Sequence, residues 1–201
     1  MFEFDFKDNS LSEIDRFVEV VLDNINAISG TRRKLMYRKG HGLPEPKGSF
    51  SISFGYCNVG YMSKDKYRKE VQGCKNLFET TLMTHHPELK TIFQQLVNLH
   101  CPEPFTVDQV QINRNWQSPP HRDAGNVGES WIIGLGDYEG GETVVEFPKE
   151  HIEYNIKNTF IKFNGSKYIH WTKPYEGNRY SLVFYNHSKA KKTTSSNPFM
   201  K

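Results

Sequence analysis

A histidine and an aspartate stand two positions apart in the stretch SPPHRDAGNVG, which covers residues 118–128. In an extended chain, side chains at i and i+2 point to the same side, so His121 and Asp123 can both reach one metal ion. The pair alone is a weak signal, because His-x-Asp is common by chance. A second histidine from a distant strand would complete the two imidazoles and one carboxylate that hold a non-haem iron and leave coordination positions open.

The sequence predicts that third ligand at His170, in the strand-like run KYIHWTKPYEGNRYSLVFY (167–185). Arg179 and Ser181 follow at the start of the next predicted strand. A guanidinium can bind a carboxylate through two parallel hydrogen bonds, and a hydroxyl adds one more donor. This arrangement suits a dicarboxylate co-substrate beside a metal. A core histidine beside Trp171 is the alternative for His170, and the presence of Arg179 and Ser181 favours the metal ligand.

The same tripeptide, His-Arg-Asp, also occurs in the catalytic loop of protein kinases, where the aspartate is the base. A kinase requires in addition a glycine-rich phosphate loop upstream and an Asp-Phe-Gly sequence downstream. Neither is present in this sequence, so the pattern argues against a kinase.

The chain after residue 106 consists of short runs of strand-forming residues separated by Gly, Pro and Asn, which is typical of a sandwich or barrel. The runs are FTVDQVQINRNW, ESWIIGLGDY, ETVVEF, TFIKFN, YIHWT and RYSLVFYN. Upstream, apolar residues at helical spacing predict a helix over residues 10–29 and a second helical region over 76–99, interrupted near Pro87. Between them, SFSISFGYCNVGYM (49–62) predicts a strand or hairpin.

These patterns predict an α+β protein whose N-terminal helices pack on one sheet of a β-rich core. We expect one compact domain with three parts: a largely helical region at 1–105, the catalytic core at 106–188 and a flexible tail at 189–201.

Taken together, His121-x-Asp123, His170 and Arg179-x-Ser181 resemble the motif series of the Fe(II)/2-oxoglutarate-dependent dioxygenases. The turn GDYEGGETVVEF between them resembles one that recurs there in this superfamily, and residues 106–187 carry the resemblance. It implies a double-stranded β-helix, or jelly-roll, with Fe(II) on the two histidines and the aspartate. It further implies that 2-oxoglutarate and O2 are co-substrates, that Arg179 and Ser181 hold the far carboxylate, and that a C–H bond is hydroxylated.

The stretches PPHRD, GLGDYEGGE and HWTKPYEGNRYSLVFY resemble, within that superfamily, the nucleobase oxygenases related to the TET and base-J thymine hydroxylases. This finer resemblance implies a modified base or nucleotide in nucleic acid as substrate. Prolyl hydroxylases share much of the pattern, so a protein side chain or a small metabolite stays open as the substrate. A non-catalytic cupin-like binding module is the alternative from another functional class.

A basic loop precedes the first predicted strand and contains no acidic residue between its first and last cation. It predicts either a solvated surface loop or an element that contacts phosphates. Its cations are Arg32, Arg33, Lys34, Arg38 and Lys39.

Three amides, Gln111, Asn113 and Asn115, alternate along the strand predicted before the iron motif. An inward-facing amide is costly unless it is hydrogen-bonded, so Asn113 and Asn115 either line the co-substrate pocket or bind a neighbouring backbone. Weaker candidates for lining the site are Asn126, Ser130, Trp131 and Tyr138.

The composition sets broad limits: 201 residues, a formal net charge of +3 and 36% hydrophobic residues. The mildly basic balance permits a nucleic-acid partner without requiring one. No apolar run approaches the roughly 18 residues of a membrane span, and the acidic, aromatic start is unlike a signal peptide. Three widely spaced cysteines form no Cys-x-x-Cys pair, so we expect no disulfide framework and an intracellular protein, cytoplasmic or nuclear.

Overall fold

The computed structural model describes residues 49–57, 78–80, 82–83, 86–101, 105, 107 and 109–186. The helix predicted over 10–29, the basic loop at 32–39 and the predicted tail lie outside these ranges.

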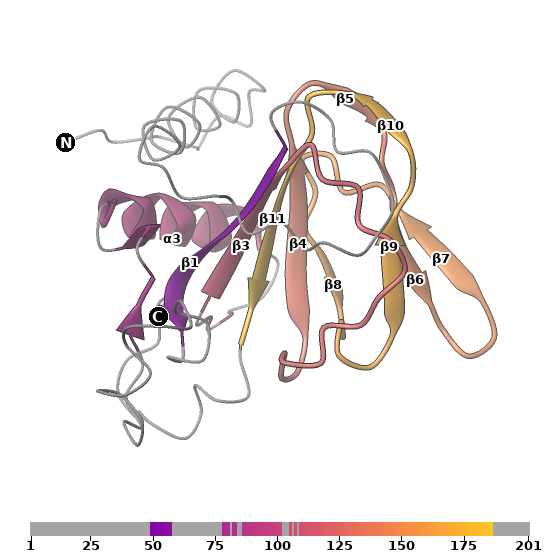
Figure 1. Cartoon of the computed structure of the whole chain (residues 1–201), viewed down its shortest axis with the longest axis horizontal. Helices are drawn as coiled ribbons and strands as arrows, with labels where there is room; N and C mark the ends of the chain where they lie inside the picture. Colours follow the sequence, from indigo (N-terminus) through magenta and orange to yellow (C-terminus); the bar gives the residue numbers. More distant parts are fainter. Residues whose placement is uncertain are drawn as a thin grey trace, which may run out of the picture.

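The described chain is mostly β-structure with one long helix (Figure 1). The large antiparallel sheet contains, in spatial order, β2 (Phe78–Glu79), β1 (Phe50–Cys57), β3 (Gln109–Arg114), β11 (Tyr180–Tyr185), β4 (Ser130–Leu135) and β8 (Ile161–Phe163). A three-stranded sheet contains β7 (His151–Tyr154), β6 (Thr143–Glu146) and β9 (Ile169–Thr172), and a short pair contains β10 (Tyr175–Gly177) and β5 (Tyr138–Gly140). The helix is α3 (Glu88–His100).

The large sheet is apolar on the side that α3 covers (Figure 1). Alternate residues of its strands face the helix, as the period of two along a strand requires. Phe93 of α3 lies at the centre of this core, with its ring edge-on to Phe54 of β1 at 5.2 Å and to Phe184 of β11 at 6.1 Å. Leu89 and Leu96 are likewise fully buried, so α3 buries one stripe against the sheet.

The prediction of a helical region from residue 76 is wrong at its start. Phe78 and Glu79 form β2 and pair with Cys57 and Tyr56 of β1. The long helix begins only after Pro87, because proline fits the first turn of a helix and disfavours helical backbone in the residue before it.

The opposite face of the large sheet is polar along β1 and β3 and apolar along β4 and β8. On the apolar part, Ile132 and Phe163 pack against Val145 of the three-stranded sheet and against Ile156. The two sheets therefore face each other across a second, smaller core, to the right of α3 in Figure 1.

The sequence runs beyond residue 106 are confirmed as strands, but β7 and β10 were not predicted. Both are short and largely exposed, with burial alternating along β7, so neither carries a run of apolar residues. No helix in the described part of the chain is long and apolar enough to cross a membrane.

Candidate active site

The three predicted metal ligands meet between the two sheets. The backbone N–H of His121 donates to the carbonyl of His170 at 3.1 Å, and the N–H of His170 donates back to His121 at 3.0 Å. The N–H of Asp123 donates to the carbonyl of Gly165 at 2.9 Å. The loop that carries His121 and Asp123 is thus fastened by its backbone to β9 and to the turn before it.

The ligand atoms have the spacing of a single metal site. Nε2 of His170 lies 3.4 Å from Oδ2 of Asp123, and Nε2 of His121 lies 3.6 Å from Oδ1. The three metal-ligand atoms all lie within 4.8 Å of one another. Adjacent ligands about 2.1 Å from one ion are separated by about 3 Å, so a small inward movement would let all three bind one divalent cation.

Both imidazoles are oriented by bonds from their other nitrogen. Nδ1 of His121 lies 2.7 Å from the carbonyl of Pro119, and Nδ1 of His170 lies 3.1 Å from the carbonyl of Tyr168. A carbonyl only accepts, so each Nδ1 carries a proton, and in the neutral imidazole Nε2 then presents a lone pair. Nδ2 of Asn126 donates to Oδ2 of Asp123 at 3.3 Å, which fixes the carboxylate as well.

Gly165 is a residue that the sequence analysis missed. A Cβ at this position would lie 3.0 Å from Oδ2 of Asp123 and 3.3 Å from Cε1 of His170. The close approach of these ligands therefore favours glycine here, because a Cβ would displace Asp123 or His170 by a few tenths of an ångström. The only sequence signal was the turn Asn-Gly-Ser before His170, which does not distinguish a tight turn from a ligand support.

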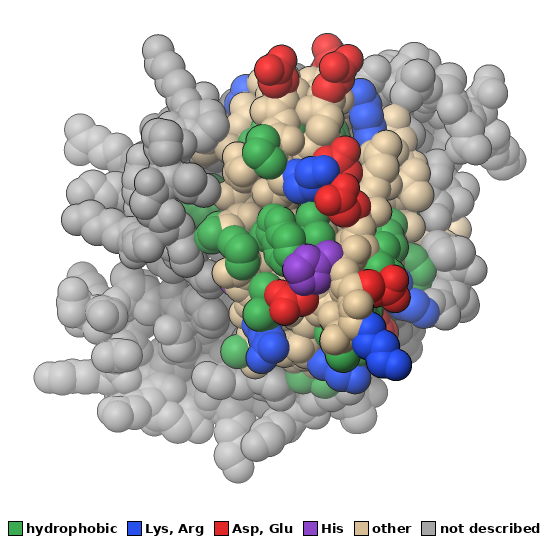
Figure 2. Space-filling model, turned by 90° about the vertical axis from the view of Figure 1, so that its right-hand side faces the viewer, with side chains coloured by type: hydrophobic (Ala, Val, Ile, Leu, Met, Phe, Trp, Pro, Cys, Tyr) green, Lys and Arg blue, Asp and Glu red, His purple; other side chains and the backbone are tan. Residues whose placement is uncertain are grey.

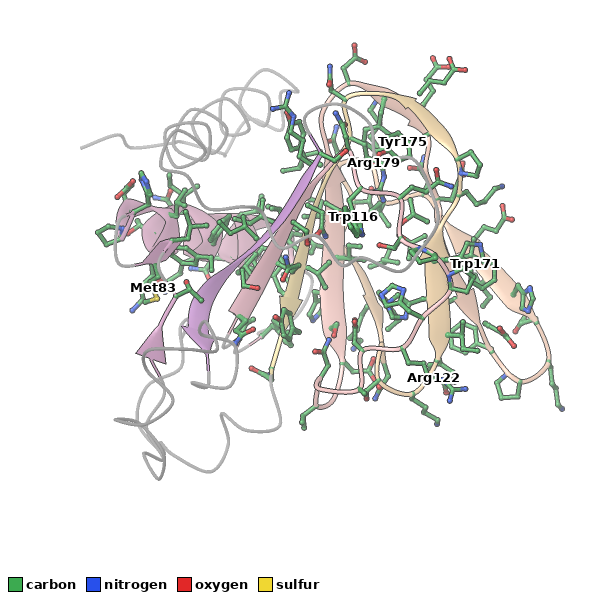
Figure 3. The ribbon with its side chains drawn as sticks, viewed as in Figure 1. Met83, Trp116, Arg122, Trp171, Tyr175 and Arg179 are labelled. Carbon is green, nitrogen blue, oxygen red and sulfur yellow. The ribbon has the colours of Figure 1, made fainter. Side chains whose placement is uncertain are left out.

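Arg179 is buried beside Tyr138 and Tyr175, and these three residues are called the arginine pocket. Its side chain is 1% exposed, and within the described part of the chain its Nε and Nη2 have no hydrogen-bond partner of normal geometry. The rings of Tyr138 and Tyr175 each lie 5.5 Å from the guanidinium carbon, and among the residues that the structure describes their buried hydroxyls have no hydrogen-bond partner of normal geometry. Figure 3 shows Arg179 and Tyr175 together near the upper ends of the strands, with Arg122 at the opposite end.

Burial shifts the pKa values of Arg179, Tyr138 and Tyr175. It lowers the pKa of Arg179, an effect that the adjacent Tyr138 and Tyr175 oppose. Burial also raises the pKa of both phenols, and the cation of Arg179 offsets part of that rise. At neutral pH the two hydroxyls are therefore neutral donors beside a cation. Unpaired buried donors are costly, so this group fits an anion, and a carboxylate accepts from several donors at once.

The turn between β5 and β6 makes room for this pocket. Gly141 has a φ of 71°, and a Cβ there would lie 2.8 Å from Nε of Arg179. Both features require glycine. The segment GDYEGGE thus supplies Tyr138 to the pocket and, through Gly141, the space for the arginine.

The predicted site amides bind other protein groups. Nδ2 of Asn113 donates to Oγ of Ser181 at 3.2 Å. Asn115 follows β3 with a φ of 48°, and its Oδ1 accepts from the backbone N–H of Arg179 at 2.9 Å. Asn115 therefore has the geometry of the backbone-binding alternative, and it positions Arg179. A direct role of either amide in co-substrate binding stays a prediction.

The prediction that Trp131 lines the site is wrong, because it lies on the helix-facing side of β4 in the main core, 4% exposed. Ser130 lies on the other face of β4, 3.5 Å from Nδ2 of Asn126. The cations of the basic loop at 32–39 lie outside the described residues.

No protein-family model and no curated protein matches this sequence. Solved structures do match. The structure of NgTET1 in complex with 5mC DNA is 12% identical, with a TM-score of 0.53 over 89% of this chain and 70% of that chain. A 2OG-Fe(II) oxygenase family oxidoreductase from Burkholderia pseudomallei is 22% identical, with a TM-score of 0.39 over 55% of this chain and 60% of that chain. A prolyl-4-hydroxylase from Pseudomonas putida is 10% identical, with a TM-score of 0.45 over 87% of each chain.

At these identities the likeness concerns the fold, and the match to NgTET1 carries it. The chain spans 60% of the length of the Burkholderia protein. This likeness is consistent with the fold that the sequence motifs imply.

Proposed function

We propose that the protein is an Fe(II)/2-oxoglutarate-dependent dioxygenase that hydroxylates a C–H bond. The observation that carries the proposal is the buried guanidinium of Arg179, in the same fold as a His-Asp-His cluster, with two N–H groups that are unpaired among the described residues. A metal cluster alone would suit many proteins. Three metal-ligating side chains together with a buried arginine that can bind an anion suit a dicarboxylate that contacts both the metal and the arginine. In this proposal the two facing sheets form the double-stranded β-helix implied by the sequence.

The residues have separate roles in this site. His121 and His170 would hold Fe(II) through Nε2, and Asp123 through a carboxylate oxygen. Arg179 and Ser181 would hold the far carboxylate of 2-oxoglutarate. With both groups bound, iron and 2-oxoglutarate supply the oxidising chemistry that converts O2 and the substrate C–H bond to an alcohol, releasing succinate and CO2.

The protein contributes placement and the exclusion of water. Arg179 is almost completely buried, so its attraction for a carboxylate is little screened by solvent. The Nδ1 bonds of His121 and His170 keep Nε2 free of a proton at the metal. A non-catalytic binding module of the same fold has no need for a second, anion-binding pocket, so the unpaired arginine favours the enzyme.

We further propose a modified base or nucleotide in nucleic acid as the substrate. Arg122, in the chain between His121 and Asp123, is exposed, and exposed Lys167 stands 5.0 Å from the ring centre of Tyr168. Cations beside aromatic rings suit phosphates and bases. Figure 2 shows Lys and Arg side chains along the lower edge of this face, the end at which Figure 3 places Arg122. The fold likeness to NgTET1, which was solved with 5mC DNA, supports the same class.

A base within a duplex cannot reach a metal between two sheets, so it must be flipped out or presented in a single strand. The basic loop at 32–39 is expected to supply further phosphate contacts, which would make binding weaken with salt.

Succinate formation tests both parts of the proposal. The purified protein with Fe(II), 2-oxoglutarate and O2 is offered single-stranded and duplex oligonucleotides with methylated bases, and proline-containing peptides, with Asp123→Ala as the matched control. We expect oligonucleotides to raise succinate release above the substrate-free level in the parent only. No succinate under any condition would refute the oxygenase. Stimulation by peptides alone would refute the nucleic-acid substrate and leave the oxygenase standing.

A further inference from the structure

Four side-chain hydrogen bonds run in series across three strands of the large sheet, on the face toward the three-stranded sheet. They link Ser53 to Gln111 at 2.7 Å, Gln111 to Ser51 at 2.8 Å, Ser51 to Asn113 at 2.7 Å and Asn113 to Ser181 at 3.2 Å. The strand register builds this row, because Ser53 is opposite Gln111, and Asn113 is opposite both Ser51 and Ser181. This series, from Ser53 to Ser181, is called the polar row below.

The polar row has a direction, because each serine has one proton and each amide has a donor end and an acceptor end. Ser53 donates to Oε1 of Gln111, whose Nε2 then donates to Oγ of Ser51. Ser51 must therefore donate its proton to Oδ1 of Asn113. The Nδ2 end of Asn113 in turn faces Ser181, and Oγ of Ser181 accepts. The proton of Ser181 is left for a different acceptor.

Ser181, the last residue of the polar row, lies beside the arginine pocket. Ser181 is two residues from Arg179 and lies opposite Gly134 of β4. The atom that a Cβ at Gly134 would meet first is the hydroxyl of Tyr138, which has no hydrogen-bond partner of normal geometry in the described part of the structure. The free proton of Ser181 thus belongs to the same group of donors as the guanidinium and the phenol.

We propose that the polar row fixes the direction of the Ser181 hydroxyl, so that its proton is presented to the carboxylate bound at Arg179. Gln111 and Asn113 are then positioning residues that act on co-substrate affinity through Ser181 without touching the co-substrate. This inference rests on the proposed function, because it takes 2-oxoglutarate as the ligand of the pocket. It also gives a reason for the amides that alternate along β3.

The substitution Gln111→Glu should reverse the polar row at a distance from the pocket. A carboxylate at 111 accepts from Ser53 and also from Ser51, so Ser51 can no longer donate to Asn113. Asn113 then turns its amide, and Oδ1 takes the proton of Ser181 away from the pocket. We expect the Kd for 2-oxoglutarate to rise about tenfold or more, the factor that corresponds to losing a hydrogen bond to a charged group.

The test is an anaerobic calorimetric titration of 2-oxoglutarate into the Fe(II)-loaded protein, with thermal unfolding of every variant as the folding check. The added negative charge of Gln111→Glu could also repel the ligand directly. The same substitution made in the Ser181→Ala protein separates the two effects. Direct repulsion would still raise the Kd there, whereas an effect that acts through Ser181 would vanish. Ser53→Thr is the matched control, because it keeps the hydroxyl that donates to Gln111 and so leaves the links and their direction intact, and its Kd should stay within about twofold of the parent.

A rise in Kd for Gln111→Glu that disappears in the Ser181→Ala background would support the inference. An unchanged Kd, or an equal rise in both backgrounds, would overturn it. If the parent binds 2-oxoglutarate and Arg179→Met does not, while Gln111→Glu matches the parent, this inference alone fails. If the Fe(II)-loaded parent does not bind 2-oxoglutarate, the proposed function fails and this inference fails with it.

Discussion

Replacing Arg179 by Met should weaken co-substrate binding by at least about 30-fold while leaving the free protein about as stable as before. In the free protein, the substitution removes two buried N–H donors that have no partner among the described residues, and each such donor costs about 1–3 kcal/mol. It also removes the contacts of the guanidinium with the rings of Tyr138 and Tyr175, which are worth about 1–2 kcal/mol each when desolvated. The two effects nearly cancel, so the free energy of unfolding should change by less than about 2 kcal/mol.

The balance is different with 2-oxoglutarate bound, because the same donors are then paired with a carboxylate. Truncating one partner of a buried, hydrogen-bonded charge pair costs about 2–5 kcal/mol, which raises Kd by about 30-fold to several thousandfold. The assay is denaturant unfolding without ligand, followed by anaerobic titration of 2-oxoglutarate into the Fe(II)-loaded protein. Arg179→Lys is the control, since it keeps the charge and loses the planar pair of donors. A variant that unfolds easily yet keeps its affinity for 2-oxoglutarate would refute the reasoning.

Three further predictions concern single side chains. Gly165→Ala places a Cβ 3.0 Å from Oδ2 of Asp123, so it should weaken Fe(II) binding by about 10–100-fold in a folded protein, as metal titration and circular dichroism would measure; unchanged affinity would contradict the close fit. His170→Ala should abolish iron-dependent succinate formation with the thermal midpoint nearly retained, and full activity would remove His170 from the site. Tyr138→Phe should raise the Kd for 2-oxoglutarate about tenfold. In the parent protein, the Kd should stay constant up to about pH 10. Burial raises the pKa of Tyr138 above its usual 10.0, so below that pH the hydroxyl keeps the proton that it donates. A decline in the parent's affinity between pH 7 and 9 would exclude that role for the phenol.

The metal ligands and the arginine were predictable from the sequence because their chemistry is local. His121 and Asp123 lie two apart on an extended segment, and His170 and Arg179 lie on strong strand patterns whose order matches a known motif series. The main strands were predictable for a similar reason, since each is a local run of strand-forming residues bounded by turn residues. Trp131 shows the limit of that pattern, because the sequence does not say which of the two faces leads to the site.

Features that depend on pairing between distant strands could not be predicted. Gly165 looks like any turn glycine until Asp123 is known to pack against it. Tyr175 lies on β10, which is too short and exposed to give a strand pattern. The role of Gln111 as a link in the polar row follows only from the register of β1 against β3, which places Ser53 opposite it.

The central claim is that Fe(II) on His121, Asp123 and His170 and 2-oxoglutarate on Arg179 bind together in one site. Anaerobic absorption spectroscopy tests it most directly, because a weak visible charge-transfer band arises when 2-oxoglutarate chelates Fe(II). The account predicts that the band appears when one equivalent of each is added to the parent protein, and that Asp123→Ala, folded and treated identically, does not show it. A parent that binds Fe(II) but develops no band with saturating 2-oxoglutarate, or an Asp123→Ala variant that develops the same band, would contradict the account.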